Sequence, residues 1–377
     1  MPARGTGPTG LEAVGSVAVR TFAAHQSQSP QQAQTAHQSM DGQHVNAMAG
    51  DGSGRVHNHF ADYDELPDGH FYDPDAEYEP DPEYAATLAP DAARQRRERI
   101  GPTGRPLPYF PIPGPLTNHG PATIIAMCNQ KGGVGKTTST INLGAALAEY
   151  GRRVLLVDFD PQGALSVGLG VNPMELDLTV YNLLMERGMS ADEVLLKTAV
   201  PNMDLLPSNI DLSAAEVQLV SEVARESTLQ RALKPLMDDY DYIVIDCQPS
   251  LGLLTVNALT AAHKVIVPLE CEFFALRGVA LLTETIEKVQ ERLNPELELD
   301  GILATMYDSR TVHSREVLAR VVEAFDDHVY HTVIGRTVRF PETTVAGEPI
   351  TTYASNSVGA AAYRQLAREV LARCHAE

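Results

Sequence analysis

A glycine-rich segment between an apolar run and a long helical pattern has the composition of a phosphate-binding loop. It reads CNQKGGVGKTT over residues 128–138. Glycines let successive backbone N–H groups turn toward one anion, a lysine can reach β- and γ-phosphate oxygens, and a neighbouring hydroxyl can bind Mg²⁺. The helix that follows adds the positive end of its dipole. The segment predicts a nucleoside triphosphate site with Mg²⁺, in which the binding residues are Lys131, Gly132, Gly133, Val134, Gly135, Lys136, Thr137 and Thr138.

The loop departs from the common G-x-x-x-x-G-K-[ST] pattern at its start. Gln130 stands where the first glycine is usual, and Lys131 adds a second lysine to Lys136. Two lysines carry more positive charge than one triphosphate needs within a single subunit. The phosphate of a second subunit is therefore a natural target for Lys131.

Aspartates end two of the apolar runs that flank this loop. Asp158 and Asp160 lie in DFDPQ at 158–162, and Asp246 begins DCQPS at 246–250. Ligands of open α/β sheets bind at the carboxyl ends of strands, so all three carboxylates could face the nucleotide. We expect Asp246 to hold the Mg²⁺ water shell beside Thr137, and Asp160 to orient the attacking water, with Asp158 supporting it. A strand-ending aspartate can also serve only as a helix cap or turn residue, and this reading is strongest for Asp158.

The elements that must position these residues alternate between short β-branched runs and longer amphipathic stretches. Uninterrupted apolar runs predict strands covered on both faces, and they occupy residues 123–128, 153–158, 242–246, 264–268 and 301–306. Helical patterns lie near 136–150, 211–237, 253–262, 275–293, 312–325 and 357–373. The alternation predicts an α/β fold: a three-layer P-loop NTPase domain with a mostly parallel sheet, over 122–377.

The residues before this domain have a different composition. Residues 25–59 are rich in Gln, His, Ser, Gly and Ala, and residues 60–84 carry ten acidic residues with no Lys or Arg. Without periodic apolar positions, the expected state of 1–105 is a disordered acidic low-complexity tail. The acidic and aromatic stretch 60–84 could dock a basic partner, although a solvated tail is the simpler reading. A Pro-rich linker is expected over 106–121.

Net charge and cysteine spacing restrict the class of protein. Residues 1–105 carry 8 arginines and 15 acids, and the rest of the chain carries 21 basic and 34 acidic residues, so the two parts contribute −7 and −13 to the total of −20. An acidic surface disfavours nucleic-acid binding unless a local positive patch exists. The four cysteines lack metal-ligand or disulfide-scaffold spacing. No apolar run reaches the length of a membrane span, so we expect a cytoplasmic protein with no membrane contact.

Three segments together resemble the ParA/Soj chromosome-partitioning ATPases, a branch of the deviant P-loop class that also contains MinD and the nitrogenase iron protein. They are KGGVGKTT, LLVDFDPQG and VIDCQPSLGLLTVNAL, and the similarity runs from about Ala122 to Val370. The resemblance implies ATP and Mg²⁺ as ligands and hydrolysis to ADP and phosphate. It also implies an ATP-bound homodimer in which Lys131 reaches the phosphates of the other subunit, so that Lys131, Lys136 and Asp160 form the catalytic set.

The same resemblance implies non-specific DNA binding through C-terminal arginines, and hydrolysis stimulated by a ParB-like or other partner protein. The matching positions are Arg310, Arg336 and Arg339. Residues 310–340 carry five arginines against four acids, a small positive balance. The sequence TVRFPETT stands where the family has NVRLSEAP, and solvated surface arginines are the simpler interpretation. A DNA-binding family member would be cytoplasmic and nucleoid-associated.

The sequence also bears on three other classes of function and on one alternative within the family. A ParA-like regulatory switch that recruits condensation or cell-pole proteins, with little DNA binding, is the main alternative. A MinD-like membrane ATPase is disfavoured because the C-terminal helical stretch lacks bulky apolar side chains on one face. An iron–sulfur reductase would need paired cysteines, and a tyrosine autokinase would need a C-terminal tyrosine cluster.

Overall fold

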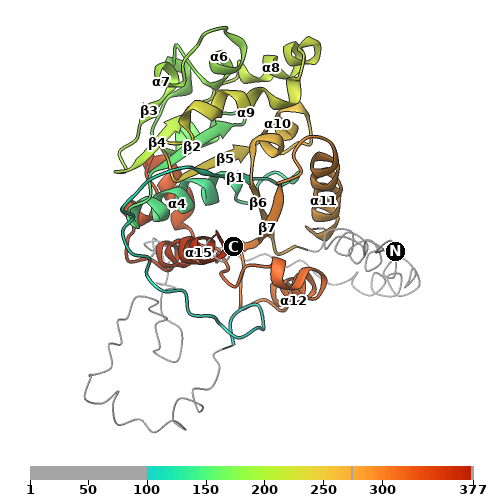
Figure 1. Ribbon diagram of the computed structural model, residues 1–377. Helices are drawn as coiled ribbons and strands as arrows, with labels where there is room; N and C mark the ends of the chain where they lie inside the picture. The colour runs from blue at the N-terminus through green and yellow to red at the C-terminus, as the bar shows by residue number, and fades with distance from the viewer. Residues whose placement is uncertain (1–99, 273–274, 375–377) are drawn as a thin grey trace, which may run out of the picture.

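One sheet of seven strands organises residues 100–272 and 275–374, the part of the chain that the computed structural model describes (Figure 1). The strand order is β3-β4-β2-β5-β1-β6-β7, and all neighbours run parallel except β3 and β4. Parallel strands need crossover helices, which is why both faces of the sheet are covered. The strands are β1 (Thr123–Met127), β2 (Val154–Phe159), β3 (Leu196–Lys197), β4 (Met203–Leu206), β5 (Tyr242–Cys247), β6 (Lys264–Glu270) and β7 (Glu298–Thr305).

Two helical layers cover the sheet and give a three-layer α/β domain. Helices α4 and α15 pack on one face, whereas α8 to α12 pack on the other. The α-helices are α4 (Lys136–Glu149), α5 (Ala164–Gly168), α6 (Val180–Met185), α7 (Ala191–Val194), α8 (Leu212–Gln218), α9 (Thr228–Leu233), α10 (Leu253–Ala261), α11 (Ala275–Arg292), α12 (Val312–Phe325), α13 (Arg339–Ala346), α14 (Ile350–Tyr353) and α15 (Val358–Cys374). In the part of the chain that the structure describes, no helix combines the length and apolar character that crossing a bilayer requires.

The fold class predicted from the sequence is confirmed, and all five predicted strands are present. Strands β3 and β4 were not predicted. In β4 a buried aspartate, Asp204, interrupts the apolar run, and its charge is accommodated only by contacts from elsewhere: Lys197 Nζ lies 2.7 Å from Asp204 Oδ2, and the Tyr240 hydroxyl donates to the same oxygen at 2.7 Å. A buried charge with two such partners is tolerated where an unpaired one would not be.

The single helical stretch predicted over 211–237 is wrong, because the chain breaks between α8 and α9. Ala224 adopts a left-handed conformation with φ of 52°, which ends helical geometry. The buried side chain of Asn257 on α10 binds the backbone of the segment that follows this break. Its Nδ2 donates to the Arg225 carbonyl at 2.9 Å, and its Oδ1 accepts from the Leu229 amide at 3.2 Å. These tertiary hydrogen bonds satisfy backbone groups that a continuous helix would pair internally.

Residues 100–121 form an extended segment that lies on the domain. The Arg105 guanidinium donates to the carbonyls of Asp326 and Val329, beyond the end of α12. At the other end of the segment, His119 Nδ1 lies 2.8 Å from Asp241 Oδ2. The predicted absence of helix from the Pro-rich stretch is thus observed. Of the tail predicted over 1–105, residues 1–99 lie outside the part of the chain that the structure describes.

Candidate functional site

The phosphate-binding loop connects the end of β1 to the first residue of α4. Gly133 and Gly135 have φ of 73° and 85°, a conformation that glycine adopts without steric cost. Gly135 is the N-cap of α4 and, as a glycine, provides no side-chain cap hydrogen bond, and the first turn of the helix contains no acidic residue. The first N–H groups of the 14-residue helix, together with the helix dipole, are therefore available to an anion.

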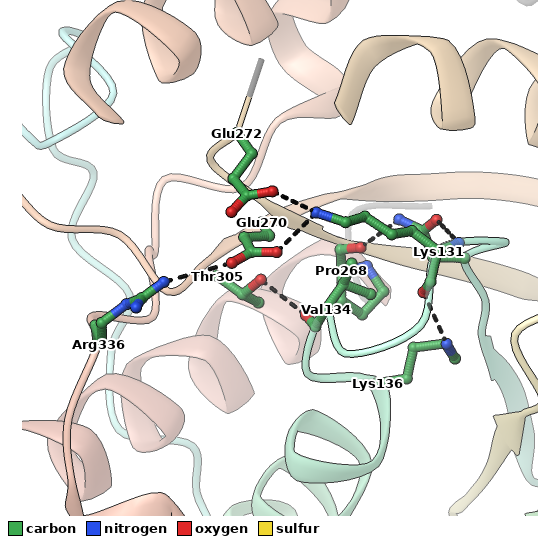
Figure 2. Close-up of polar contacts among 9 residues, drawn as sticks. Lys131, Val134, Lys136, Pro268, Glu270, Glu272, Thr305 and Arg336 are labelled. Atoms are coloured by element: carbon green, nitrogen blue, oxygen red, sulfur yellow. Dashed lines mark hydrogen bonds and ion pairs between the residues drawn. The ribbon is translucent and has the colours of Figure 1, made fainter. Parts of the chain in front are cut away.

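Side chains from two distant strands fix the loop in this conformation. Thr305, the last residue of β7, donates from Oγ1 to the Val134 carbonyl at 2.8 Å (Figure 2). Asn129 donates from Nδ2 to the Pro268 carbonyl on β6 at 2.7 Å and accepts the Lys131 amide at 2.9 Å. Both residues are buried. Neither Asn129 nor Thr305 could be identified from the sequence, because their role depends on the order of the strands.

Lys136 is the buried lysine of the loop. It is the first residue of α4, only 7% exposed, and its Nζ donates to the Lys131 carbonyl at 3.2 Å. Its ammonium therefore lies against the loop backbone (Figure 2). A cation held at this place beside the free N–H groups of α4 is suited to bind phosphate oxygens.

Thr137 and Asp246 meet as the sequence predicts. Thr137 Oγ1 donates to Asp246 Oδ2 at 2.7 Å, and Thr140 Oγ1 lies 3.5 Å from the other carboxylate oxygen. Asp246 is 1% exposed at the end of β5, and burial, with the charge of Asp158 next in importance, raises its pKa to about 8. A buried carboxylate of this kind is strongly stabilised by a nearby cation. The pair therefore fits a bound Mg²⁺, for which hydroxyl and carboxylate oxygens are the preferred ligands.

Asp158 faces Asp246 across the pairing of β2 with β5. It is fully buried and accepts hydrogen bonds from the Ser166 amide at 2.8 Å and the Ser166 hydroxyl at 2.7 Å. Burial raises its pKa to about 6, although the hydrogen bonds from Ser166 act in the opposite direction. Asp158 thus anchors α5 and adds negative charge beside Asp246.

Asp160 lies just beyond the end of β2 and is only partly buried. Its Oδ1 accepts the Gln162 amide at 2.9 Å, which orients the carboxylate within its turn. One carboxylate oxygen is used in this way, and the side chain remains accessible at the carboxyl edge of the sheet. A partly exposed, oriented carboxylate at this edge can contact a water molecule.

A cavity of about 510 Å³ lies beside the loop and was not predicted from the sequence. Its volume is within the range of small-molecule sites. Its lining combines the loop, the end of β7 and α13, and includes Gly135, Thr138, Glu270, Thr305, Met306, Gly335, Arg336, Phe340 and Tyr363. A larger cavity of about 590 Å³ lies at the opposite, amino-terminal edge of the sheet, lined by Arg153 and Asn202 among others.

Lys131 contacts two carboxylates of its own chain. Its Nζ donates to Glu270 Oε2 at 2.8 Å and to Glu272 Oε2 at 2.7 Å (Figure 2). Partial burial disfavours the charged ammonium, but the two hydrogen bonds outweigh it and raise the pKa of Lys131. The predicted contact of Lys131 with a second subunit remains a prediction. No pattern in the sequence indicated that Glu270 and Glu272 would contact Lys131, since they lie about 140 residues further along the chain.

The three arginines expected to bind DNA lie on adjoining segments. A parallel bridge between Tyr307 and Gly335 brings the loop after β7 beside the segment that leads into α13. Each arginine is exposed and has a carboxylate neighbour: Arg310 with Asp308 at 2.9 Å, Arg336 with Glu270 at 3.4 Å, and Arg339 with Glu342 at 3.1 Å. The three arginines thus lie near one another, and the neighbouring carboxylates balance part of their positive charge.

Comparisons with known proteins agree with this geometry. A family model described as an AAA domain matches residues 122–299. An uncharacterized protein of Mycobacterium tuberculosis is 69% identical over 274 residues, which cover 73% of this chain and 86% of that protein. The sporulation initiation inhibitor protein Soj of Bacillus subtilis is 48% identical over 249 residues, covering 66% of this chain and 98% of Soj. The chromosome partitioning protein ParA of Caulobacter vibrioides is 47% identical over 255 residues, covering 67% and 95%.

A solved structure adds ligands to the comparison. It is the crystal structure of cobyrinic acid a,c-diamide synthase from Mycobacterium smegmatis with a bound ATP analogue and magnesium. The two chains are 45% identical, with a TM-score of 0.61, over 68% of this chain and 96% of the other.

Proposed function

Because this chain belongs to the ParA/Soj/MinD family of P-loop ATPases, we propose that it is an ATP-dependent dimerising ATPase of chromosome or plasmid partitioning. In this proposal the ATP-bound homodimer binds DNA non-specifically, and a ParB-like or other partner resets it by stimulating hydrolysis to ADP and phosphate. The observation that carries the nucleotide part is the Thr137 hydroxyl on Asp246, at 2.7 Å, beside the uncapped start of α4. The protein would act in the cytoplasm, associated with the nucleoid.

Each residue of the site has a task in this proposal. Lys136 and the first N–H groups of α4 bind the phosphates, and the cavity beside Thr138 and Phe340 accepts the base. Thr137 and Asp246 would hold Mg²⁺, which neutralises phosphate charge when it is bound. Asp160 orients the water that attacks the terminal phosphate. The side chain of Lys131 leaves its contacts within its own chain and reaches the phosphates bound by the partner subunit.

An exposed apolar surface beside the loop supports dimerisation. Ile210, Val217, Val220 and Val223, on and around α8, are between 59% and 91% exposed. Helix α8 adjoins the segment that follows Asp246, since Gln248 Nε2 donates to Glu216 Oε1 at 2.9 Å. A second subunit that approaches the phosphate loop would cover these side chains, and burying them favours association.

The alternative is a regulatory switch that uses the same ATP cycle to recruit protein partners, with little DNA binding. One observation favours it: Arg310, Arg336 and Arg339 each have a carboxylate neighbour within 3.4 Å. Such neighbours reduce the positive potential that phosphate attraction requires.

A titration of non-specific duplex distinguishes the two functions. The protein is mixed with a non-hydrolysable ATP analogue or with ADP, and binding is followed by interferometry at two salt concentrations. The partitioning proposal expects binding with the ATP analogue only, independent of sequence and much weaker at the higher salt concentration. Absence of binding at low salt, with dimerisation intact, would favour the regulatory switch.

A further inference from the structure

The ammonium of Lys131 lies between two carboxylates, an arrangement that we call the Lys131 clamp and define by Lys131, Glu270 and Glu272 (Figure 2). The Nζ to oxygen distances are 2.8 and 2.7 Å. The Lys131 side chain is 42% exposed, Glu270 13% and Glu272 54%. One positive charge thus faces two negative charges at the edge of the nucleotide site.

The sheet fixes the position of one of the two carboxylates in the clamp, that of Glu270. Glu270 is the last residue of β6 and pairs in register with Thr305 of β7, whose hydroxyl binds the Val134 carbonyl in the phosphate loop. The same strand pair therefore fixes both the loop and the Glu270 carboxylate. Lys131 is held by a preformed acceptor, and little side-chain ordering is needed to form that contact.

The ammonium of Lys131 cannot contact a phosphate while it is hydrogen-bonded to both glutamates of the clamp. Two of the three N–H donors of the ammonium are engaged, and the three side chains carry one positive and two negative charges, of which Arg336, at 3.4 Å, partly balances that of Glu270. A phosphate brought to Lys131 in place would meet the two carboxylates and be repelled. Lys131 must leave both glutamates before it contacts an anion.

We propose that Glu270 and Glu272 are positioning residues that retain Lys131 in the nucleotide-free subunit, and thereby set the protein concentration at which the ATP-bound chain dimerises. This inference rests on the proposed role of Lys131 in the partner subunit's site. Dimerisation must first break the clamp, so its free energy is subtracted from that of association. The clamp therefore raises the protein concentration that is needed for the ATP-bound chain to dimerise.

The surroundings of the clamp make its opening reversible. Glu272 is exposed, so water solvates its carboxylate as soon as Lys131 leaves. Glu270 keeps Arg336, whose Nη2 lies 3.4 Å from its other oxygen, so its partly buried charge stays partnered. Exposed ion pairs contribute little and are screened by salt. The clamp therefore adjusts a threshold and does not lock the protein in one state.

The first measurement detects the clamp without any dimer. Amine-reactive labelling of Lys131 is followed by mass spectrometry in nucleotide-free protein for wild type, Glu272→Gln and Glu270→Gln/Glu272→Gln. The exposed Glu323 on α12 provides the matched control, Glu323→Gln. Loss of the hydrogen-bonded anions exposes the amine and lowers its proton affinity, so labelling should accelerate about two- to five-fold in Glu272→Gln and more in the double variant. Labelling that matches wild type in both variants would overturn the clamp.

The second measurement tests its consequence. Sedimentation with a non-hydrolysable ATP analogue gives the protein concentration at half-dimerisation, and nucleotide affinity is measured separately at protein concentrations far below it. We expect Glu272→Gln to lower the dimerisation midpoint about two- to five-fold, with the nucleotide affinity of the monomer within two-fold of wild type. The control Glu323→Gln should leave the midpoint unchanged.

Failure of the inference and failure of the proposed function give different results. If labelling accelerates while the midpoint of Glu272→Gln and the double variant stays at the wild-type value, the clamp exists but does not govern association, and the inference is overturned. If wild type and every variant remain monomeric with the ATP analogue, the dimer itself is absent and both fall. Dimerisation by the double variant alone supports the inference.

Discussion

The hydroxyl of Thr137 donates a hydrogen bond to Asp246 over 2.7 Å and so joins the first turn of α4 to the end of β5. The two residues are 109 positions apart in the chain. Asp246 is nearly fully buried and faces a second buried carboxylate, Asp158, in the adjacent strand. This concentration of negative charge is costly without a cation nearby, so the site trades stability of the empty protein for affinity toward Mg²⁺ and nucleotide.

Replacement of Asp246 by asparagine should separate these two effects. Asn retains the shape and an oxygen that can accept from Thr137, but it removes a buried ionisable group whose pKa is raised to about 8 by burial and by the charge of Asp158. We expect Asp246→Asn to raise the melting temperature of the nucleotide-free protein by roughly 2–4 °C, while abolishing stabilisation by ATP with Mg²⁺. Differential scanning fluorimetry with and without both ligands measures this. A lower melting temperature of Asp246→Asn without ligands would show that the Asp246 carboxylate does not destabilise the empty protein.

Lys136→Ala should weaken nucleotide binding at least about 100-fold, because the phosphates lose a charge-assisted partner that is held inside the loop. Lys288→Ala removes an exposed lysine on α11 and serves as the matched control, with nucleotide affinity unchanged. Isothermal titration calorimetry with the ATP analogue gives both dissociation constants. Wild-type affinity in Lys136→Ala would refute the assignment of the phosphate site.

Asp160→Ala should retain ATP binding and dimerisation but lower the rate of hydrolysis at least about 100-fold. Orientation of the water matters in the transition state and hardly at all in the bound ground state. Phosphate release is compared with Asp177→Ala, which removes an exposed aspartate elsewhere. Turnover by Asp160→Ala at the wild-type rate would assign the water-orienting role to another group.

Arg310→Glu and Arg339→Glu should each remove ATP-dependent DNA binding while leaving dimerisation intact, since neither residue belongs to the phosphate loop. Charge reversal replaces an attraction to phosphate by a repulsion, and it also places two acids side by side at Asp308 or Glu342. Arg187→Glu, at an exposed site after α6, controls for net charge. DNA binding that survives both reversals would place the DNA-binding surface elsewhere.

Arg105→Ala should lower the melting temperature by a few degrees, because the guanidinium loses hydrogen bonds to the Asp326 and Val329 carbonyls that are worth about 1–3 kcal/mol together. Removal of residues 1–99, whose composition offers few periodic apolar positions, should leave it unchanged. Thermal unfolding of the two variants beside wild type measures the contrast. Equal melting temperatures for Arg105→Ala and wild type would show that this contact does not stabilise the domain.

Local signals in the sequence determined the phosphate loop, the principal strands and the pairing of Thr137 with Asp246. A glycine-rich turn, the lysine and hydroxyl after it, and aspartates that end apolar strands are contiguous patterns, and strand ends of a parallel sheet meet at one edge. The same patterns gave the correct boundaries of α10 and α12 to within a residue or two. Each pattern is formed by neighbouring residues, and the geometry of a parallel sheet then brings Thr137 and Asp246 to the same edge although they are 109 positions apart.

Only the tertiary structure decided which distant side chains complete the site. Glu270 and Glu272 reach Lys131 because β6 lies next to β1, and Thr305 reaches Val134 because β7 lies next to β6. Asn257 on α10 hydrogen-bonds backbone groups of Arg225 and Leu229, just after the break in the helix predicted over 211–237. These contacts join residues 28 to 171 positions apart. Their formation depends on strand order and packing, which no local pattern of residue types encodes.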